Sequence, residues 1–288
     1  MGAADPPLTI AEVLRRSTAY LSERGSPSPR LDADLLLAHA LGVERLRLYT
    51  DSERPLTAPE LTRARDLLAR RGRREPMAYL TGERAFRRMS LSVGPRVLVP
   101  RPETEALVEW ALEVAPPGGA VVDWGSGSGA VALALAGEGD GLRVTALERS
   151  PEALEAARAN GARLGLEVEW LRSDGFAAVA GRRFAVIAAN PPYLSQADLA
   201  AAPPELAFEP AEALVAGPTG LEAIARIAAE APGHLEPGGW VLIEVGDGQA
   251  PAAREALRAA GLGAVAARAD LAGVERVVGG RAAPATRG

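Results

Sequence analysis

Apolar positions in the first quarter of the chain repeat at the spacing of amphipathic helices. Between Thr9 and Arg24 they recur every three or four residues, and Thr9 is placed to cap the segment. Similar segments follow at 31–41, 44–50 and 57–71, and Gly42 and Gly72 end two of them. This pattern predicts a small helical bundle as a first domain, residues 1–75.

The pattern then changes twice. Residues 76–102 place apolar positions among Gly94, Pro95 and Pro100, which is typical of a β-hairpin, and we expect a hairpin linker there. After a helix at 104–114, apolar strands alternate with amphipathic helices. The expected strands are 120–124, 143–148, 167–171, 184–189, 240–245, 264–268 and 275–279, and the expected helices are 130–136, 151–164, 219–231 and 250–260. Such alternation predicts an α/β domain over residues 103–288, Rossmann-like, with a seven-stranded, mostly parallel sheet.

Composition excludes several kinds of chemistry. The chain has no Cys and only two His, so we expect neither a thiol nucleophile nor a metal site. All 32 basic residues are Arg, which excludes a Schiff-base or P-loop lysine. No apolar run is long enough to span a membrane and the N-terminus has no secretory pattern, so we expect a cytoplasmic protein.

Charge differs between the two predicted domains. Residues 1–88 carry 16 Arg against 12 acids, whereas residues 89–288 carry 16 Arg against 25 acids. The first part can therefore be a docking arm for an acidic partner through Arg70, Arg71, Arg73 and Arg74, or simply an Arg-rich solvated surface.

A glycine-rich loop follows the first predicted strand of the α/β domain. It contains Asp123, Gly125, Ser126, Gly127, Ser128 and Gly129. Glycines let the backbone approach a ligand closely, although they can also serve helix packing alone. Asp123 would repel a pyrophosphate and attract the ammonium group of an amino acid. Glu148 ends the second strand, where an acid can accept the hydroxyls of a ribose.

Two further loops carry candidate ligands for the same site. Asp174 follows the third strand and could accept a hydrogen bond from an adenine amine, or could be an ordinary turn former. The fourth strand ends in Asn190, Pro191, Pro192 and Tyr193. The Asn190 side chain and the Pro191 carbonyl offer two acceptors for a planar NH₂ group, and Tyr193 offers a ring to stack on it. The alternative is a proline strand terminator with a buried tyrosine.

These motifs together resemble the PrmC/HemK family of glutamine methyltransferases that act on peptide-chain release factors. The resemblance covers residues 79–288 and rests on YLTGE at 79–83, VPRPETE at 99–105, the glycine loop, NPPY at 190–193, FEP at 208–210, PGG at 237–239, EVG at 244–246 and ERV at 275–277. The helical region resembles the substrate-docking domain of the family more weakly.

The resemblance implies an enzyme that transfers a methyl group from S-adenosylmethionine to the glutamine of the Gly-Gly-Gln motif in class-1 release factors. It implies that the loop Gly125–Gly129 and Glu148 bind the cofactor, with Asp123, Asp174 and Asn190 beside it, and that Asn190, Pro191, Pro192 and Tyr193 hold the glutamine. Two positions depart from the family pattern. Gly175 stands where the family commonly has Trp, so we expect Phe176 to supply an apolar wall instead, and Thr219 replaces a common Asp.

Other functions remain open at the level of sequence. An adenine-amine DNA methyltransferase would use the same Asn-Pro-Pro-Tyr chemistry, but it needs a cationic surface that the acidic second part lacks. A glutamine methyltransferase of a ribosomal protein is harder to separate. A catalytically silent S-adenosylmethionine-binding module and a dinucleotide-dependent hydride-transfer enzyme are further alternatives. We expect a monomer that binds no nucleic acid stably and no membrane.

Overall fold

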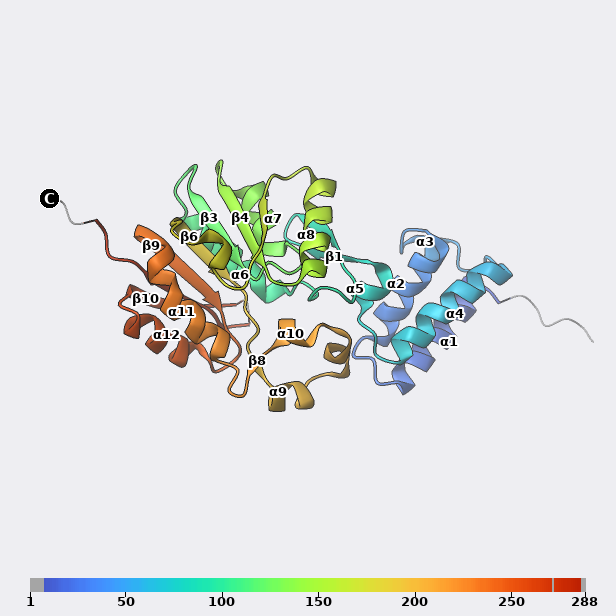
Figure 1. The fold of residues 1–288 in the computed structure, drawn as a ribbon. Coiled ribbons are helices and arrows are strands. Elements are labelled where there is room, and N and C mark those ends of the chain that lie inside the picture. Colours follow the sequence, from blue (N-terminus) through green and yellow to red (C-terminus); the bar gives the residue numbers. More distant parts are fainter. Residues whose placement is uncertain (1–7, 271, 286–288) are drawn as a thin grey trace, which may run out of the picture. The chain divides into compact units, whose positions relative to one another are not determined.

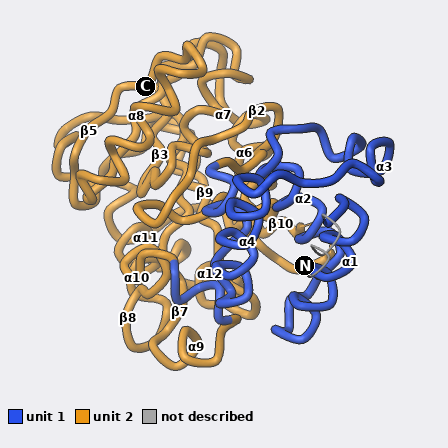
Figure 2. The backbone as a smooth tube through the Cα atoms, turned by 90° about the vertical axis from the view of Figure 1, so that its right-hand side faces the viewer, with its two compact units in different colours: residues 1–82, 204–208 blue, residues 83–203, 209–288 orange. Residues whose placement is uncertain are grey.

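The computed structural model describes residues 8–270 and 272–285. The chain forms two compact units (Figures 1 and 2). Unit 1 comprises residues up to Gly82 together with the short segment Pro204–Phe208, and unit 2 comprises Glu83–Pro203 and the chain from Glu209 onward. The chain therefore passes from one unit to the other at 82/83, 203/204 and 208/209.

Unit 1 is the predicted helical bundle. Its helices are α1 (Ile10–Glu23), α2 (Pro29–Leu41), α3 (Arg47–Thr50), α4 (Ala58–Gly72) and α5 (Met77–Thr81). Fully buried leucines, among them Leu21, Leu36 and Leu48, form its core. Thr9 caps α1 through its side chain, as the sequence suggests, and Gly42 ends α2 in the left-handed conformation. The helix α5 lies in the segment that we expected to be part of a hairpin linker.

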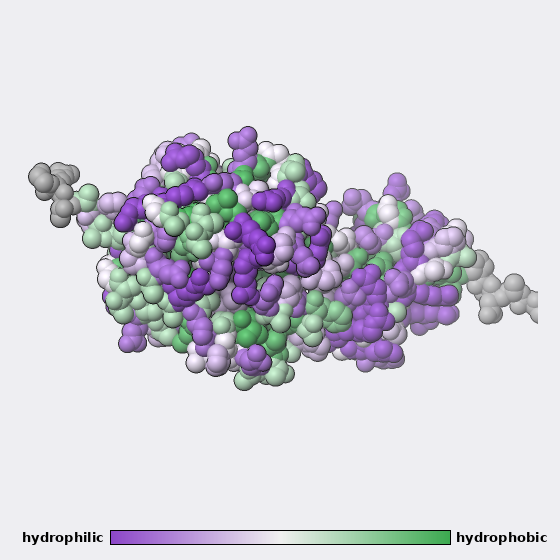
Figure 3. All heavy atoms as spheres, in the orientation of Figure 1, coloured by the Kyte–Doolittle hydropathy of each residue, from purple (hydrophilic) through white to green (hydrophobic). Residues whose placement is uncertain are grey.

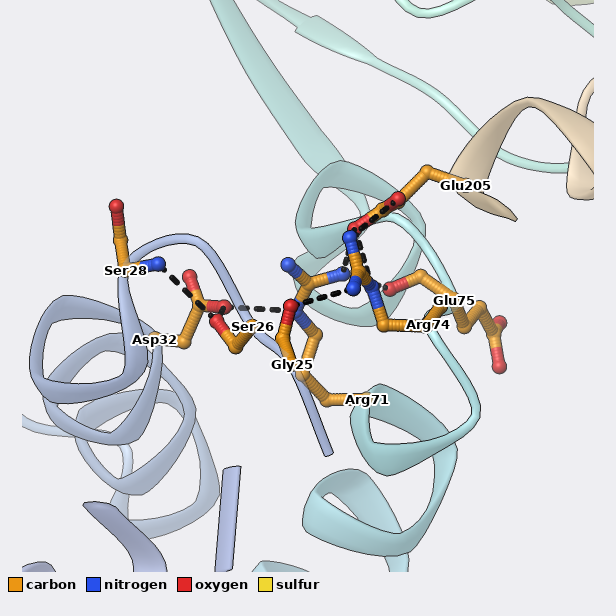
Figure 4. Close-up of polar contacts among 8 residues, drawn as sticks. All are labelled: Gly25, Ser26, Ser28, Asp32, Arg71, Arg74, Glu75 and Glu205. Carbon is orange, nitrogen blue, oxygen red and sulfur yellow. Dashed lines mark hydrogen bonds and ion pairs between the residues drawn. The ribbon is translucent and has the colours of Figure 1, made fainter. Parts of the chain in front are cut away.

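A buried polar cluster joins Pro204–Phe208 to the rest of unit 1 (Figure 4). Arg71 is 4% exposed and donates to Asp32 (2.7 Å) and to Glu205 (3.1 Å). Arg74 donates to both oxygens of the same Glu205 carboxylate (2.8 and 2.9 Å). Because a buried charge is tolerated only when it is paired, these contacts hold the segment in the bundle.

The same cluster changes our expectation for the four arginines at and just after the end of α4. Arg71 and Arg74 pair within unit 1, and Arg70 pairs with Glu75 (2.6 Å). Of the four arginines that we considered for docking, Arg73 alone is exposed. Three of these four arginines therefore form ion pairs within unit 1.

Unit 2 begins with a two-stranded hairpin, β1 (Glu83–Phe86) and β2 (Met89–Ser92). Its main sheet has seven strands, as predicted, and their order is β10-β11-β9-β6-β3-β4-β5. The central strands β3 (Ala120–Trp124), β4 (Arg143–Glu148), β5 (Glu169–Arg172), β6 (Phe184–Ala189) and β9 (Leu235–Glu244) are parallel. The strands β10 (Gly263–Ala269) and β11 (Glu275–Arg281) are antiparallel additions at one edge.

Helices cover the two faces of this sheet, as expected for a doubly wound fold (Figure 1). The helices α6 (Glu105–Val114) and α7 (Ala130–Glu138) pack on one face, and α11 (Glu222–His234) and α12 (Ala250–Ala259) pack on the other. The helix α8 (Pro151–Leu164) follows β4 and is capped by the Ser150 side chain. Neighbouring strand residues alternate between the faces, so that Val121 and Val186 belong to one core cluster and Val122 and Ile187 to the other.

A long connection between β6 and β9 contains elements that the sequence analysis did not predict. They are β7 (Leu194–Ser195), α9 (Gln196–Ala201), the 3₁₀ turn Pro204–Phe208, α10 (Ala211–Leu214) and β8 (Val215–Gly217). Further 3₁₀ turns lie at Pro102–Thr104 and Ala177–Val179. Elements of two to six residues carry too little periodicity to be predicted from sequence.

The visible surface mixes hydrophilic and hydrophobic residues rather than presenting one large apolar area (Figure 3). Among the described residues, no helix has the length and apolar character that crossing a membrane requires.

Candidate active site

A cavity of about 300 Å³ lies in unit 2 at the carboxyl ends of β3, β4 and β6. Ligands of open α/β sheets bind at these strand ends, and the volume is in the range of small-molecule sites. The predicted site residues on its wall are Asp123, Gly125, Ser126, Gly127, Ser128, Glu148, Asp174, Asn190 and Pro192. Gly129, Pro191 and Tyr193 lie next to these residues in the chain but do not line the cavity itself.

The glycine loop needs its glycines for backbone conformation and for packing. Gly125, Gly127 and Gly129 have φ values of 76°, 54° and 84°, in the left-handed region. A Cβ on Gly129 would also lie 3.0 Å from the Trp170 ring and 3.1 Å from Leu133. The loop therefore turns sharply from β3 into α7 and brings its backbone to the cavity.

Asp123 is a buried carboxylate at the carboxyl end of β3. It is 1% exposed and accepts a hydrogen bond from the Ala132 backbone N–H (3.1 Å). Burial, with a smaller contribution from the neighbouring Glu148 carboxylate, raises its pKa from 3.8 to about 7. A cation bound beside Asp123 would stabilise the ionised form, so the site favours a positively charged ligand group.

Glu148 joins the glycine loop to the start of α8. Its two oxygens accept hydrogen bonds from the backbone N–H groups of Gly127 (2.9 Å) and Ser150 (2.8 Å). Each carboxylate oxygen has a second lone pair, so the predicted contact with ribose hydroxyls is compatible with these bonds. Glu148 therefore also has a structural role that the sequence analysis did not foresee.

The donor set of the cavity fits S-adenosylmethionine. The buried polar atoms of the described residues that lack a hydrogen-bond partner include Ser126 Oγ and Trp124 Nε1, and the residues of both atoms line the cavity. These donors suit a carboxylate, Asp123 suits an ammonium group, and Glu148 suits vicinal hydroxyls. Within the described part of the chain, no cluster of three or more His, Cys, Asp or Glu side chains could hold a metal ion.

The loop after β5 differs from the sequence expectation. The Asp174 side chain is 72% exposed and pairs with Arg226 Nη1 at 2.6 Å. Gly175 has a φ of 61°, and a Cβ there would lie 2.5 Å from Arg226 Nη2, so Arg226 occupies the space beside it. The expectation that Phe176 forms a wall of the site is wrong. Phe176 is buried in the core and stacks on His234, away from the cavity wall.

Asn190 and Tyr193 are held by residues from other segments. Asn190 Nδ2 donates to Thr104 Oγ1 (3.0 Å). The backbone carbonyl of Tyr193 accepts from Gln249 Nε2 (2.8 Å), and Gly246 lies so close that a Cβ would be 3.2 Å from the Tyr193 ring. Burial and the nearby Glu244 carboxylate raise the pKa of Tyr193 to about 12, so its hydroxyl is neutral.

The structure gives roles to residues of the VPRPETE, FEP and EVG segments, for which the sequence alone predicted none. Glu209 of the FEP segment accepts from the Val99 backbone N–H (2.9 Å) and pairs with Arg101, which fixes the loop that leads to Thr104. Glu244 and Gly246 of the EVG segment contact Thr104 and Tyr193. The signal in the sequence was the motifs themselves, because the residues joined here are more than 50 positions apart.

The fold and the cavity define an S-adenosylmethionine-dependent methyltransferase. A solved methyltransferase from Pyrococcus furiosus shares this fold with a TM-score of 0.52 at 21% identity, over 67% of this chain and 88% of that chain. Residues 12–82 match the family model of the PrmC N-terminal domain, and residues 102–217 match that of the methyltransferase small domain.

Relatives at higher identity specify the family. A release factor glutamine methyltransferase of Geobacter sulfurreducens is 40% identical over 95% of this chain and 96% of its own length. Its counterpart in Burkholderia pseudomallei is 46% identical over 96% of each chain. The chain belongs to the release factor glutamine methyltransferase family.

Proposed function

We propose that this protein transfers a methyl group from S-adenosylmethionine to the side-chain amide nitrogen of the glutamine in the Gly-Gly-Gln motif of class-1 release factors. The proposal rests on the position of Asn190, which directly follows β6 and lies on the wall of the same cavity as the glycine loop and Glu148. The full-length similarity to release factor glutamine methyltransferases supports this substrate.

The difficulty of the reaction lies in the nucleophile. An amide nitrogen is weakly nucleophilic because its lone pair is delocalised into the carbonyl group. In the proposed mechanism, Asn190 Oδ1 and the Pro191 carbonyl accept the two N–H groups of the glutamine, and Tyr193 packs on the amide face. These contacts favour positive charge on nitrogen and orient it for attack.

When bound, S-adenosylmethionine supplies an electrophilic methyl group on a sulfonium centre. Asp123 and Glu148 hold its cationic and hydroxyl groups in this proposal, and Pro192 borders the acceptor side of the cavity. The N-methylated amide cation is acidic enough to lose its proton to water, so the proposal requires no dedicated base.

A labelling experiment tests the substrate. The protein is incubated with methyl-labelled S-adenosylmethionine and a purified class-1 release factor, and the modified peptide is located by mass spectrometry. We expect one methyl group on the glutamine of the Gly-Gly-Gln motif. Labelling of a ribosomal protein or of DNA adenine, with an unmodified release factor, would contradict the proposal.

We further propose that the helical unit binds the release factor through an apolar surface rather than through the four arginines at and just after the end of α4. The exposed large apolar side chains of the described residues all lie in this unit, at Leu31, Leu35, Val43, Leu46 and Tyr49. An excess of exposed apolar side chains in one unit favours a binding surface there. Leu46→Asp, at a site 72% exposed, should raise KM for the release factor and leave the dissociation constant for S-adenosylmethionine unchanged.

Charge reversal of Arg73, the exposed one of the four arginines first considered for docking, serves as the control and should change KM less. We also propose a monomer that works in the cytoplasm and binds no nucleic acid stably, in keeping with a protein substrate.

A further inference from the structure

Asn190 is the start of a hydrogen-bonded chain that leads away from the cavity. Its Nδ2 donates to Thr104 Oγ1 (3.0 Å), and the Thr104 hydroxyl is the hydrogen-bonding side chain beside the Glu244 carboxylate, whose pKa it lowers. Thr104 is 3% exposed and Glu244 is 2% exposed. Asn190 and Glu244 come together because β6 and β9 are parallel neighbours in which Ala189 pairs with Ile243.

The donors and acceptors of Asn190, Thr104 and Glu244 determine the direction of each hydrogen bond between them. An ionised carboxylate only accepts hydrogen bonds, so the Thr104 hydroxyl must give its one proton to Glu244. The Thr104 oxygen can then only accept, and the group of Asn190 that faces it must be the NH₂ group. The amide oxygen of Asn190 is thereby turned away from Thr104.

We propose that Thr104 and Glu244 are positioning residues that fix the orientation of the Asn190 amide, so that Oδ1 faces the glutamine NH₂ group. The proposal rests on the role of Asn190 proposed above. In the flipped orientation the Asn190 NH₂ group would meet the NH₂ group of the glutamine, and two donors cannot form a hydrogen bond.

Two features of the structure argue for this role over a purely structural one. Thr104 lies at the start of α6, but its side chain makes no capping hydrogen bond to that helix. Glu244 is buried and its Oε2 lacks a hydrogen-bond partner among the described residues, which is a costly arrangement for stability alone. Glu103, Arg101, Arg276 and Tyr193 are the charged and titratable groups around the Glu244 carboxylate.

Variants of Thr104 separate orientation from packing. Thr104→Val keeps the shape and removes the hydroxyl, whereas Thr104→Ser keeps the hydroxyl. We expect the valine variant to lower kcat for methylation of a release factor by about tenfold or more, the scale of one lost hydrogen bond in an oriented network. The serine variant should retain roughly a third or more of the rate, and the dissociation constant for S-adenosylmethionine should be unchanged in both.

Thr145 offers a matched control in the same unit. It accepts from Arg182 Nη2 (3.0 Å) and donates to Glu169 (2.8 Å), so it makes the same pair of bonds outside the cavity. Thr145→Val should leave kcat and KM unchanged. If Thr104→Val lowers the melting temperature, Thr104→Ala, which cannot overpack the site, replaces it in the comparison with serine.

The outcomes are distinguishable from failure of the proposed function. A wild-type protein that does not methylate the Gly-Gly-Gln glutamine would overturn the proposed substrate. An active wild type whose valine variant keeps full kcat, or whose serine variant is as impaired as the valine variant, would overturn the positioning role of Thr104 and Glu244.

Discussion

A buried carboxylate is associated with each end of the cavity, and the two are held differently. Asp123 lines the cavity itself, whereas Glu244 lies beside Thr104, which lines it. Asp123 and Glu244 are 1% and 2% exposed, and burial raises the pKa of each to about 7. Asp123 accepts from a backbone N–H of α7, whereas the group beside Glu244 that lowers its pKa by hydrogen bonding is the Thr104 hydroxyl. Similar electrostatics therefore serve different purposes at the two ends.

The two contacts differ in whether they can orient a neighbouring side chain. A backbone N–H has a fixed polarity, so Asp123 can only add charge to the site where the cofactor binds in our proposal. The Thr104 hydroxyl can donate in one direction and accept from the other, so Glu244 sets the polarity of Asn190 two hydrogen bonds away. We therefore expect changes at the Asp123 end to affect binding and changes at the Glu244 end to affect rate.

Asn190→Ala should have the largest effect and tests this separation directly. Removing one preorganised polar group that contacts the reacting atoms costs about 100-fold or more in kcat. Because Asn190 lies at the acceptor end, the dissociation constant for S-adenosylmethionine should stay within about twofold of wild type. Single-turnover kinetics and calorimetry measure the two quantities. Near-normal turnover, or a loss confined to cofactor affinity, would contradict the proposed role.

Much of the architecture could be predicted from the sequence, because long periodic segments and strand-ending motifs are local signals. The seven strands, the glycine loop and the position of Asn190 at the end of β6 follow from such signals. The contacts of Thr104 with Asn190 and Glu244 could not be predicted, because they depend on which strands are neighbours and on side-chain geometry. The misplaced Phe176 has the same cause, since its burial against His234 is a tertiary contact.

Glu148→Ala should produce the next largest effect, and this effect should be on the affinity for S-adenosylmethionine. Deleting an acceptor leaves ligand hydroxyls unpaired, which weakens S-adenosylmethionine binding by roughly 1–3 kcal/mol. The rate at saturating cofactor should change much less than in Asn190→Ala. Because Glu148 also accepts from Gly127 and Ser150, the melting temperature of the variant must be measured alongside. Unchanged affinity by calorimetry would refute the ribose contact.

The two carboxylates titrate over the same pH range but should affect different measured quantities. Lowering the pH from about 8 to about 6 protonates groups whose pKa is near 7, so both ends lose their anion over this window. Protonated Asp123 attracts a cation less, which should weaken S-adenosylmethionine binding. Protonated Glu244 can donate to Thr104, so that the Asn190 amide is no longer held in a single orientation. The rate at saturating cofactor should therefore fall by up to about tenfold at the acid end of the pH range.

Stability should change in the opposite direction. A carboxylate whose pKa is raised by folding contributes stability that is present below its unfolded pKa and is lost as the pH rises through about 7. The melting temperature of the protein without cofactor should therefore rise as the pH falls from about 8 to about 6, while activity falls. Glu244→Gln, which still offers an oxygen acceptor but does not titrate, should flatten the pH profile of the saturating rate. A profile that keeps its acid limb in this variant would assign that limb to another group.

Asp174→Ala should have the smallest effect and tests how far the binding end extends. The Asp174 side chain is 72% exposed and is already paired with Arg226 at 2.6 Å. An exposed ion pair contributes about 0–1 kcal/mol, and an adenine amine would have to compete with Arg226 for the same carboxylate. We therefore expect S-adenosylmethionine affinity to fall by less than about fivefold, well below the loss in Glu148→Ala. Arg226→Ala is the matched control, because it frees Asp174 without removing it. If Asp174 does bind the adenine, Arg226→Ala should tighten cofactor binding while Asp174→Ala weakens it by tenfold or more, and the binding end would then include this loop.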